Sequence, residues 1–334
     1  MPARVAINGF GRMGRLALRA AWSWADFDIV HINEIAGDAR TAAHLLKFDS
    51  IHGTWPPPVA SNDNTLLIDN QSVGYSSHEL LSSTPWQSLG IDLVIDCTGQ
   101  FKTREQLENY IVAGVRKVVV SAPMKDGTLN IVMGVNDDLY TPAHTIMTAA
   151  SCTTNCIAPL VAVVHEQLGI RHGTVTTIHN ITNTQSVLDQ YHTDLRRTRA
   201  SGTSLIPTTT GSATAITEIF PELRGKLSGL AVRVPVANAS IADCVFELQN
   251  ATSAEAVNQL FRQAASEKLS GILEVEDQPL VSADFTGNTH SCVIDAPSTM
   301  VTDDTQLKVL AWYDNEIGYV HRMMELVRKV VGSL

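Results

Sequence analysis

A cysteine near the middle of the chain stands where a thiol can carry out covalent chemistry. Cys152 lies between Ser151 and Thr153, and the apolar run at 156–168 that follows has the length of a helix. The N–H groups and partial positive charge at a helix start stabilise an anion, so this position predicts a thiol of lowered pKa. We therefore interpret Cys152 as a nucleophile rather than as a small buried hydrophobic residue.

A histidine follows a β-branched segment further along the chain. Residues 174–178 are typical of a strand, and His179 comes directly after them. A cysteine and a histidine in contact can form a thiolate and an imidazolium, and the imidazole can act as a general base. The chain contains 11 histidines, so a structural role for His179 stays open at this point. The spacing of its histidines and cysteines matches no zinc site, and no metal is predicted.

Arginines and hydroxyl residues cluster after this histidine. Arg196, Arg197 and Arg199 lie close together in an otherwise acidic chain, and Thr210-Gly211 follows soon after. Arginine donors fit phosphate oxygens, and hydroxyl and glycine N–H groups can complete an anion site. Arg233 lies between apolar residues, where a charge needs a partner. The segment predicts phosphate recognition, with a solvated or interface loop as the alternative.

The N-terminus predicts the element that holds a cofactor. A strand at 4–8, the turn Gly9-Phe10-Gly11-Arg12-Met13-Gly14, a helix at 15–24 and a strand at 28–33 follow in order, and the second strand ends at Asn33-Glu34. This is the dinucleotide-binding fingerprint, in which the glycines permit the turn, the approach of a pyrophosphate and close helix packing. The carboxylate of Glu34 is expected to bind the ribose hydroxyls and to repel a 2′-phosphate, which favours NAD over NADP.

The remaining pattern predicts two domains. Apolar runs at 93–97 and 117–121 are typical of buried parallel strands, and Thr98, Gly99 and Ser121 at their ends are expected to line the cofactor. Strands at 230–234, 242–248 and 305–313 and a helix at 254–268 indicate a second, mixed domain. We predict an α/β Rossmann NAD-binding domain at 1–151, completed by a C-terminal helix at 317–334. An α+β catalytic domain with a mixed or antiparallel sheet is predicted at 152–316.

Composition narrows the class of protein. The 334 residues include 44% hydrophobic and 17% charged residues, as in ordinary globular proteins, and the formal net charge is −10. An acidic chain without a long apolar run is expected to bind neither nucleic acid nor membrane. Five cysteines at irregular spacing fit free thiols, and a cytoplasmic location is expected.

Five separated motifs together resemble the glyceraldehyde-3-phosphate dehydrogenase family. They are Gly9-Phe10-Gly11-Arg12-Met13-Gly14-Arg15, Ser151-Cys152-Thr153-Thr154-Asn155-Cys156, Asp194-Leu195-Arg196-Arg197-Thr198-Arg199, Arg233-Val234-Pro235 and Trp312-Tyr313-Asp314-Asn315-Glu316. The resemblance spans nearly the whole chain. It implies NAD-dependent oxidation of glyceraldehyde 3-phosphate to 1,3-bisphosphoglycerate, with inorganic phosphate attacking a cysteine thioester, in a homotetramer.

The resemblance also implies a role for single residues. Cys152 attacks the aldehyde, and His179 takes the hydroxyl proton. The cofactor residues it implies are Arg12 and Met13 at the pyrophosphate, Asn315 at the nicotinamide amide and Tyr319 beside that ring. The residues it implies for the substrate phosphate are Thr182 and Arg233, with Arg197 shared between the two anions. Those for the attacking phosphate are Ser151, Thr153, Thr210 and Gly211.

Departures from the usual family pattern leave alternatives open. Glu34 stands where relatives usually carry an aspartate, which lengthens the arm by one methylene. Asn180 and Ile181 replace a common serine and tyrosine. An erythrose-4-phosphate dehydrogenase is one alternative, although Thr182 argues against it. A second is the arsenate-resistance branch, in which arsenate replaces phosphate and 1-arseno-3-phosphoglycerate is formed. A protein that only binds NAD is a third.

Overall fold

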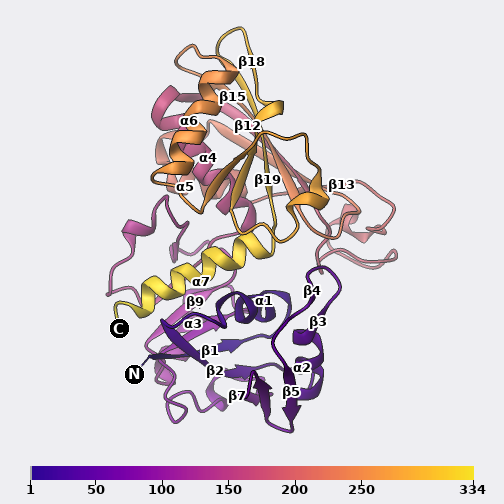
Figure 1. The fold of residues 1–334 in the computed structure, drawn as a ribbon, viewed down its shortest axis with the longest axis vertical. Coiled ribbons are helices and arrows are strands. Elements are labelled where there is room, and N and C mark those ends of the chain that lie inside the picture. The colour runs from indigo at the N-terminus through magenta and orange to yellow at the C-terminus, as the bar shows by residue number, and fades with distance from the viewer. Residues whose placement is uncertain (1) are drawn as a thin grey trace. The chain divides into compact units, whose positions relative to one another are not determined.

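The computed structural model describes residues 2–334, and the chain divides into two compact units. One unit comprises residues up to Ser151 together with Val320–Leu334, and the other comprises Cys152–Tyr319. Figure 1 shows the elements of both units. None of the helices in residues 2–334 is both long and apolar enough to cross a membrane.

The first unit is built on a nine-stranded sheet with the order β10-β11-β9-β8-β1-β2-β7-β6-β5. The strands from β10 to β7 are parallel neighbours, and β6 and β5 are added antiparallel. The strands are β1 (Ala3–Asn8), β2 (Phe27–Asn33), β5 (Val59–Asn62), β6 (Thr65–Ile68), β7 (Gln71–Ser76), β8 (Leu93–Asp96), β9 (Lys117–Val120), β10 (Leu129–Asn130) and β11 (Ile146–Thr148). A separate hairpin pairs β3 (Phe48–Asp49) with β4 (Gly53–Thr54).

Four helices accompany this sheet: α1 (Arg12–Ala21), α2 (Ala39–Lys47), α3 (Arg104–Val112) and α7 (Ile317–Val331). Thr103 and Gln106 form a capping box at the start of α3, which satisfies two N–H groups of its first turn. The end of α7 is tied to the first unit by ion pairs from Arg328 to Asp26 and from Lys329 to Asp137. A predominantly parallel sheet of this kind confirms the Rossmann prediction for the N-terminal part.

The second unit contains an eight-stranded mixed sheet. Its order is β13-β14-β12-β15-β19-β17-β16, with β18 paired to β19. The strands are β12 (Ile170–His179), β13 (Ile206–Thr209), β14 (Leu227–Arg233), β15 (Ser240–Leu248), β16 (Leu273–Glu276), β17 (Cys292–Asp295), β18 (Met300–Thr302) and β19 (Gln306–Tyr313). β12 runs parallel to β14 and antiparallel to β15. The predicted mixed sheet is confirmed.

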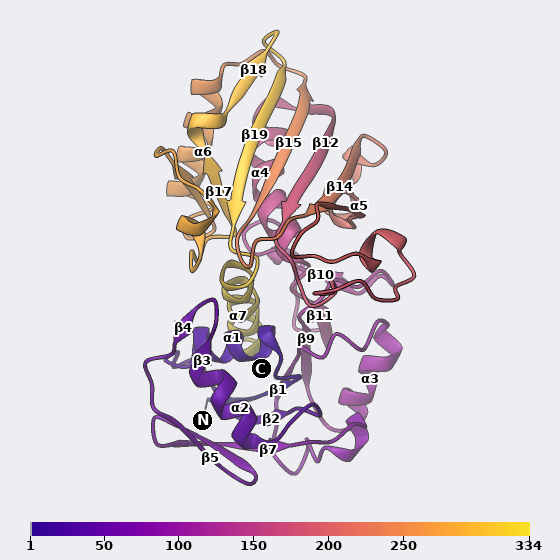
Figure 2. The same cartoon turned by 90° about the vertical axis from the view of Figure 1, so that its right-hand side faces the viewer.

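Three helices belong to the second unit: α4 (Cys152–Leu168), α5 (Ser212–Ile219) and α6 (Ala254–Ser266). Figure 2 shows α4 beside the sheet, where it packs against β12, β15, β17 and β19. Twelve of the 17 residues of α4 are buried, as its largely apolar sequence requires. The first residue of α4 and the last residues of β12, β14 and β19 carry the side chains considered next.

Candidate active site

Cys152 is the first residue of α4, as the sequence predicts. The chain enters this helix through Ala150, which adopts a left-handed backbone conformation with φ of 53°. A non-glycine residue in that region stores strain, a feature that concentrates at functional sites. After this turn, Cys152 begins both α4 and the second unit.

The Cys152 thiol faces the His179 imidazole. Cys152 Sγ lies 3.7 Å from His179 Nε2, at the end of β12, and 4.0 Å from Thr153 Oγ1. The other ring nitrogen of His179, Nδ1, lies 2.9 Å from the main-chain oxygen of Asn180 and 2.6 Å from Arg233 Nη1. The predicted thiol and imidazole are therefore in contact, and Arg233 joins them from the end of β14.

The electrostatics of this pair correct one expectation. Burial raises the pKa of the Cys152 thiol, although Thr153 and the charge of Arg233 oppose the rise. Burial and the positive charge of Arg233 lower the pKa of His179 to about 4. The helix start therefore does not by itself produce a thiolate, because desolvation outweighs it. Burial thus favours the neutral thiol, and burial together with the charge of Arg233 favours the neutral imidazole.

Hydroxyl and guanidinium groups gather in the loop after β12. Thr182 Oγ1 lies 2.9 Å from Thr184 Oγ1, and Arg197 donates to Thr184 Oγ1 at 3.1 Å. The charge of Arg197 also acts on Arg233 and lowers its pKa, after the larger effect of burial. The structure thus places Thr182, Arg197 and Arg233 in one neighbourhood.

Other predicted anion ligands lie in separate local arrangements. Thr153 Oγ1 lies 3.0 Å from Tyr313 Oη, deep in the second unit. Thr210 Oγ1 accepts from Ser212 N at the start of α5, and Gly211 is the N-cap of that helix. In the β13–β14 register Ile206 faces Arg233 and Thr209 faces Leu230, so Thr210 follows the end of β13 remote from Arg233. Ser151 is half-buried and belongs to the first unit, and it comes directly before α4 in the sequence.

The glycine turn of the first unit fits a dinucleotide. Gly9 has φ of 88°, and a Cβ there would lie 2.6 Å from the Cys97 carbonyl carbon. A Cβ on Gly14 would lie 2.2 Å from Gly9 O, whereas one on Gly11 would meet nothing within 4 Å. Gly9 and Gly14 are thus required by the backbone, and the open space beside Gly11 leaves room for a pyrophosphate.

Glu34 supports this turn directly. Its Oε2 accepts from Phe10 N at 2.6 Å, and its Oε1 accepts from Ala36 N at 2.8 Å. Each carboxylate oxygen retains a further lone pair that a ribose hydroxyl can use. The longer arm of Glu34 therefore reaches the turn itself.

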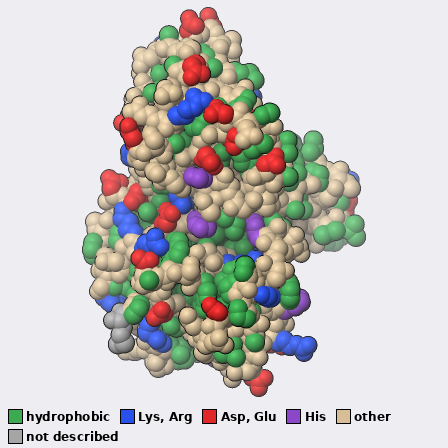
Figure 3. All heavy atoms as spheres, viewed as in Figure 1, with side chains coloured by type: hydrophobic (Ala, Val, Ile, Leu, Met, Phe, Trp, Pro, Cys, Tyr) green, Lys and Arg blue, Asp and Glu red, His purple; other side chains and the backbone are tan. Residues whose placement is uncertain are grey.

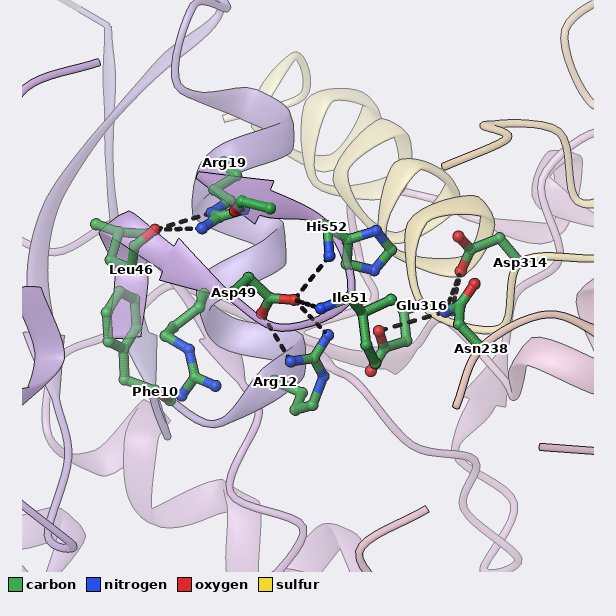
Figure 4. Close-up of polar contacts among 12 residues, drawn as sticks. Phe10, Arg12, Arg19, Leu46, Asp49, Ile51, His52, Asn238, Asp314 and Glu316 are labelled. Carbon is green, nitrogen blue, oxygen red and sulfur yellow. Dashed lines mark hydrogen bonds and ion pairs between the residues drawn. The ribbon is translucent and has the colours of Figure 1, made fainter. Parts of the chain in front are cut away.

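Arg12 points toward Asp49, as Figure 4 shows. Arg12 Nη1 and Asp49 Oδ2 are 2.7 Å apart, and Asp49 Oδ1 also accepts from the N–H groups of Ile51 and His52. Despite desolvation, these bonds hold the pKa of Asp49 well below its usual range. A phosphate bound by Arg12 would share the guanidinium with Asp49.

The remaining predicted cofactor residues lie at strand ends and turns. The N–H and the hydroxyl of Thr98 both donate to Asp96 Oδ1. Asn33 is buried at the end of β2. Asn315 is buried after β19, with Oδ1 3.5 Å from Ser240 Oγ. The degrees of exposure are buried for Phe10 and Tyr319, intermediate for Met13 and Ser121, and exposed for Gly99.

Sequence reasoning missed a buried polar chain under the glycine turn. Asn33 Nδ2 donates to Asn8 Oδ1 at 2.8 Å, Asn8 Nδ2 donates to Tyr110 Oη at 2.5 Å, and Tyr110 donates to Asp96 Oδ2 at 2.7 Å. This series of hydrogen bonds links the ends of β2, β1 and β8. Only the polar residues at three strand ends could have signalled it, because Tyr110 comes from α3.

Asn180 is a further residue to which the sequence analysis gave no role in the site. It is buried, and its Nδ2 donates to the main-chain oxygens of Ile181 and Ala237, each at 2.9 Å. These bonds fix the peptide that faces His179.

Among residues 2–334, no group of three or more His, Cys, Asp or Glu side chains is arranged to hold a metal ion.

Comparison with known proteins gives matches over most of the chain. A family model described as the glyceraldehyde 3-phosphate dehydrogenase NAD binding domain matches residues 3–104, and the C-terminal domain model of that name matches 151–315. The chain is 58% identical to glyceraldehyde-3-phosphate dehydrogenase 3 of Nostoc sp. over the full length of both. It is 47% identical to the Geobacillus stearothermophilus glyceraldehyde-3-phosphate dehydrogenase, covering all of this chain and 99% of the relative. It is 45% identical to that of Streptomyces coelicolor over the full length of both.

Proposed function

Because the chain belongs to the glyceraldehyde-3-phosphate dehydrogenase family, we propose that it oxidises glyceraldehyde 3-phosphate with NAD and transfers the acyl group to inorganic phosphate. The product is 1,3-bisphosphoglycerate. The observation that carries the proposal is the contact of 3.7 Å between Cys152 Sγ and His179 Nε2, with Arg233 beside them. A nucleophile and a base in contact, next to a cation for the substrate phosphate, are the parts that this reaction requires.

Cys152 and His179 divide the chemistry between them. His179 Nε2 takes the thiol proton while Sγ bonds to the aldehyde carbon, and returns it to the aldehyde oxygen, which gives a hemithioacetal. Nε2 then takes the proton of this hydroxyl as the carbon gives up a hydride and becomes the carbonyl of a thioester. NAD supplies the hydride acceptor. A phosphate oxygen finally bonds to the acyl carbon, the carbon–sulfur bond breaks, and Cys152 is released as a thiolate.

Three residues are proposed to bind the phosphate of the substrate. Thr182 and Arg233 hold it, and Arg197 is shared with the attacking phosphate. Among residues 2–334, the guanidinium of Arg233 has only neutral hydrogen-bond partners, and its Nε is buried without one. A buried cation of this kind favours an anion as its partner. Ser151, Thr153, Thr210 and Gly211 are proposed for the attacking phosphate.

The NAD ligands are proposed from the glycine turn and its surroundings. The open side of Gly11 supports a pyrophosphate position, and the carboxylate of Glu34 supports a ribose position. The other residues proposed here are Gly9, Phe10, Arg12, Met13, Gly14, Asn33, Thr98, Gly99, Ser121, Asn315 and Tyr319.

We also infer that several copies of the chain associate, as a homotetramer in the cytoplasm. The loop between β12 and β13 exposes large apolar side chains, namely Val187, Leu188, Tyr191, Leu195 and Leu205. Figure 3 displays the hydrophobic atoms that gather over this projecting loop. Exposed apolar groups concentrated on one segment favour a protein interface.

One set of steady-state assays tests this function. Rates are measured with glyceraldehyde 3-phosphate or erythrose 4-phosphate, each with phosphate or arsenate and with NAD or NADP. We expect the highest kcat/KM with glyceraldehyde 3-phosphate, phosphate and NAD. A higher kcat/KM for erythrose 4-phosphate would overturn the substrate, and no turnover with any pair would favour a protein that only binds NAD. Arsenate can replace phosphate as the acyl acceptor, so the rates alone do not identify the acceptor. Detection of a stable acyl phosphate product is the test of phosphate as the acceptor.

A further inference from the structure

The turn between β19 and α7 carries Asn315 between two buried acidic residues, Asp314 and Glu316. Asp314 Oδ1 accepts hydrogen bonds from the main-chain N–H groups of Glu316 and Ile317, at 2.8 and 2.9 Å. These N–H groups lie at the start of α7, where a helix provides no acceptor of its own. Asp314 Oδ2 accepts from Gly287 N at 2.7 Å. The side chain of Asp314 therefore closes the turn with three main-chain bonds.

One buried amide joins the two acidic side chains from the loop between β14 and β15. Asn238 Nδ2 donates to Asp314 Oδ1 at 3.1 Å and to Glu316 Oε2 at 3.4 Å, and Figure 4 shows it between them. Among residues 2–334, the other end of this amide, Oδ1, is buried without a partner, which costs free energy. The two bonds of Nδ2 offset that cost. Asn238 thus spans the turn that carries Asn315.

Ser240, two residues after Asn238, faces the Asn315 side chain itself. Its Oγ lies 3.5 Å from Asn315 Oδ1 and 3.4 Å from Asn180 Oδ1, so one hydroxyl proton serves two acceptors. Hydrogen bonds of this length are weak. The position of Asn315 therefore depends more on Asn238 and Asp314 than on Ser240.

The backbone between Asn238 and Ser240 is strained. Ala239 is buried and has φ of 62°, in the left-handed region that favours glycine. Such strain persists only where the surrounding contacts over-determine it, and it concentrates at ligand sites. The contacts here include the Nδ2 atom of Asn180, which donates to Ala237 O at 2.9 Å. The loop is thus a fixed support from which Asn238 reaches the turn.

We propose that Asn238 is a positioning residue for the nicotinamide end of NAD. It acts through the turn at 314–316, which it holds so that Asn315 meets the carboxamide. The inference rests on the proposed function for the role of Asn315. Its consequence is selective, because loss of Asn238 weakens the contact with nicotinamide and leaves the contacts of the glycine turn with the rest of the dinucleotide unchanged.

Binding of two ligands to the full chain tests this selectivity. ADP-ribose contains every part of NAD except nicotinamide, so the ratio of its Kd to the Kd of NAD reports the nicotinamide contact. Calorimetric titration gives both constants without turnover. A typical hydrogen bond contributes about threefold to tenfold in affinity, so Asn238→Ala should lower this ratio by roughly that factor and leave the Kd of ADP-ribose unchanged within about twofold. An unchanged ratio would overturn the proposal.

Asn258→Ala is the matched control, because Asn258 is also a buried amide of the second unit. Its partners, Ala296 O and Thr299 Oγ1, lie outside the turn at 314–316. We expect a loss of stability in urea and no change in the ratio. An equal fall of the ratio in this control would show that lost stability is the cause, and would overturn the proposal. If Asn238→Ala does not fold, Asn238→Ser, whose side chain is too short to join both acidic groups, should show the same fall.

A double variant tests whether Asn238 acts through Asn315. Residues that act through one contact have effects that do not add. In a chain that carries Asn315→Ala, the further change Asn238→Ala should therefore leave the ratio unchanged. A second fall of the same size would overturn the proposal.

These measurements use binding alone, so their failure is distinguishable from failure of the proposed function. A chain that shows the expected ratios but does not oxidise glyceraldehyde 3-phosphate would remove the function and keep the inference. Turnover of glyceraldehyde 3-phosphate with the same ratio in Asn238→Ala as in the parent would do the reverse.

Discussion

Replacing Glu34 tests how the glycine turn is held for NAD. Its two carboxylate oxygens accept from Phe10 N and Ala36 N at 2.6 and 2.8 Å. Hydrogen bonds to a charged group contribute about 1.5–3 kcal/mol each, and the lower figure applies because Glu34 is partly exposed. Glu34→Ala should therefore lower the free energy of unfolding by about 3 kcal/mol, and Glu34→Gln, which keeps one acceptor, by about half of that.

The same variants should change cofactor use. Loss of the ribose acceptor and of the turn support should raise the KM for NAD about tenfold, which corresponds to about 1.4 kcal/mol. Without the carboxylate, the 2′-phosphate of NADP is no longer repelled, so the ratio of kcat/KM for NAD to that for NADP should fall. The assay is steady-state kinetics with both cofactors, together with urea unfolding.

Glu79→Gln is the matched control. Glu79 is exposed in the same unit, and its substitution removes the same charge. We expect it to leave both unfolding and the cofactor ratio unchanged. An unaltered NAD to NADP ratio in Glu34→Ala would mean that another group selects the cofactor. Equal stability of Glu34→Gln and Glu34→Ala would refute the hydrogen-bond argument.

Three further predictions follow from single contacts. His179→Asn should reduce kcat by a factor of about 10² to 10⁴ in steady-state assays, and a fall of less than tenfold would remove His179 as the base. Tyr110→Phe should lower the free energy of unfolding by about 2–3 kcal/mol in urea, because buried Asp96 and Asn8 lose a partner; a loss below about 0.5 kcal/mol would contradict this. Burial, with a smaller contribution from His78, lowers the pKa of His31 from 6.5 to about 4. The stability this gives is therefore present above pH 6.5 and is lost as the pH falls toward 4, by about 2 kcal/mol at pH 5. His31→Gln should lose less stability than the parent between pH 7 and 5, and an equal loss would contradict the assignment.

The local elements could be predicted from the sequence because their signals are local. The glycine turn after a strand, the apolar run after Cys152 and the β-branched run before His179 all appear as expected, in β1, α4 and β12. The first helix begins at Arg12, three residues before its predicted start, because the glycine motif itself supplies the first turn.

The contacts that tune the site could not be predicted in this way. Arg233 was expected to need a partner, but its bond to His179 Nδ1 depends on the parallel register of β12 and β14, which pairs His179 with Arg233. The raised pKa of Cys152 depends on its burial in the folded chain, which a helix-start argument leaves out. Long-range packing therefore decides the protonation states, while sequence spacing decides which residues take part.

The central claim is that the Cys152 sulfur forms the covalent link to the substrate. Intact-protein and peptide mass spectrometry after mixing the enzyme with glyceraldehyde 3-phosphate and NAD, without phosphate, tests it most directly. We predict an acyl adduct on the peptide that contains Cys152, removed on adding phosphate and absent in Cys152→Ala. Turnover without any adduct, or an adduct on another cysteine such as Cys97, would contradict the account.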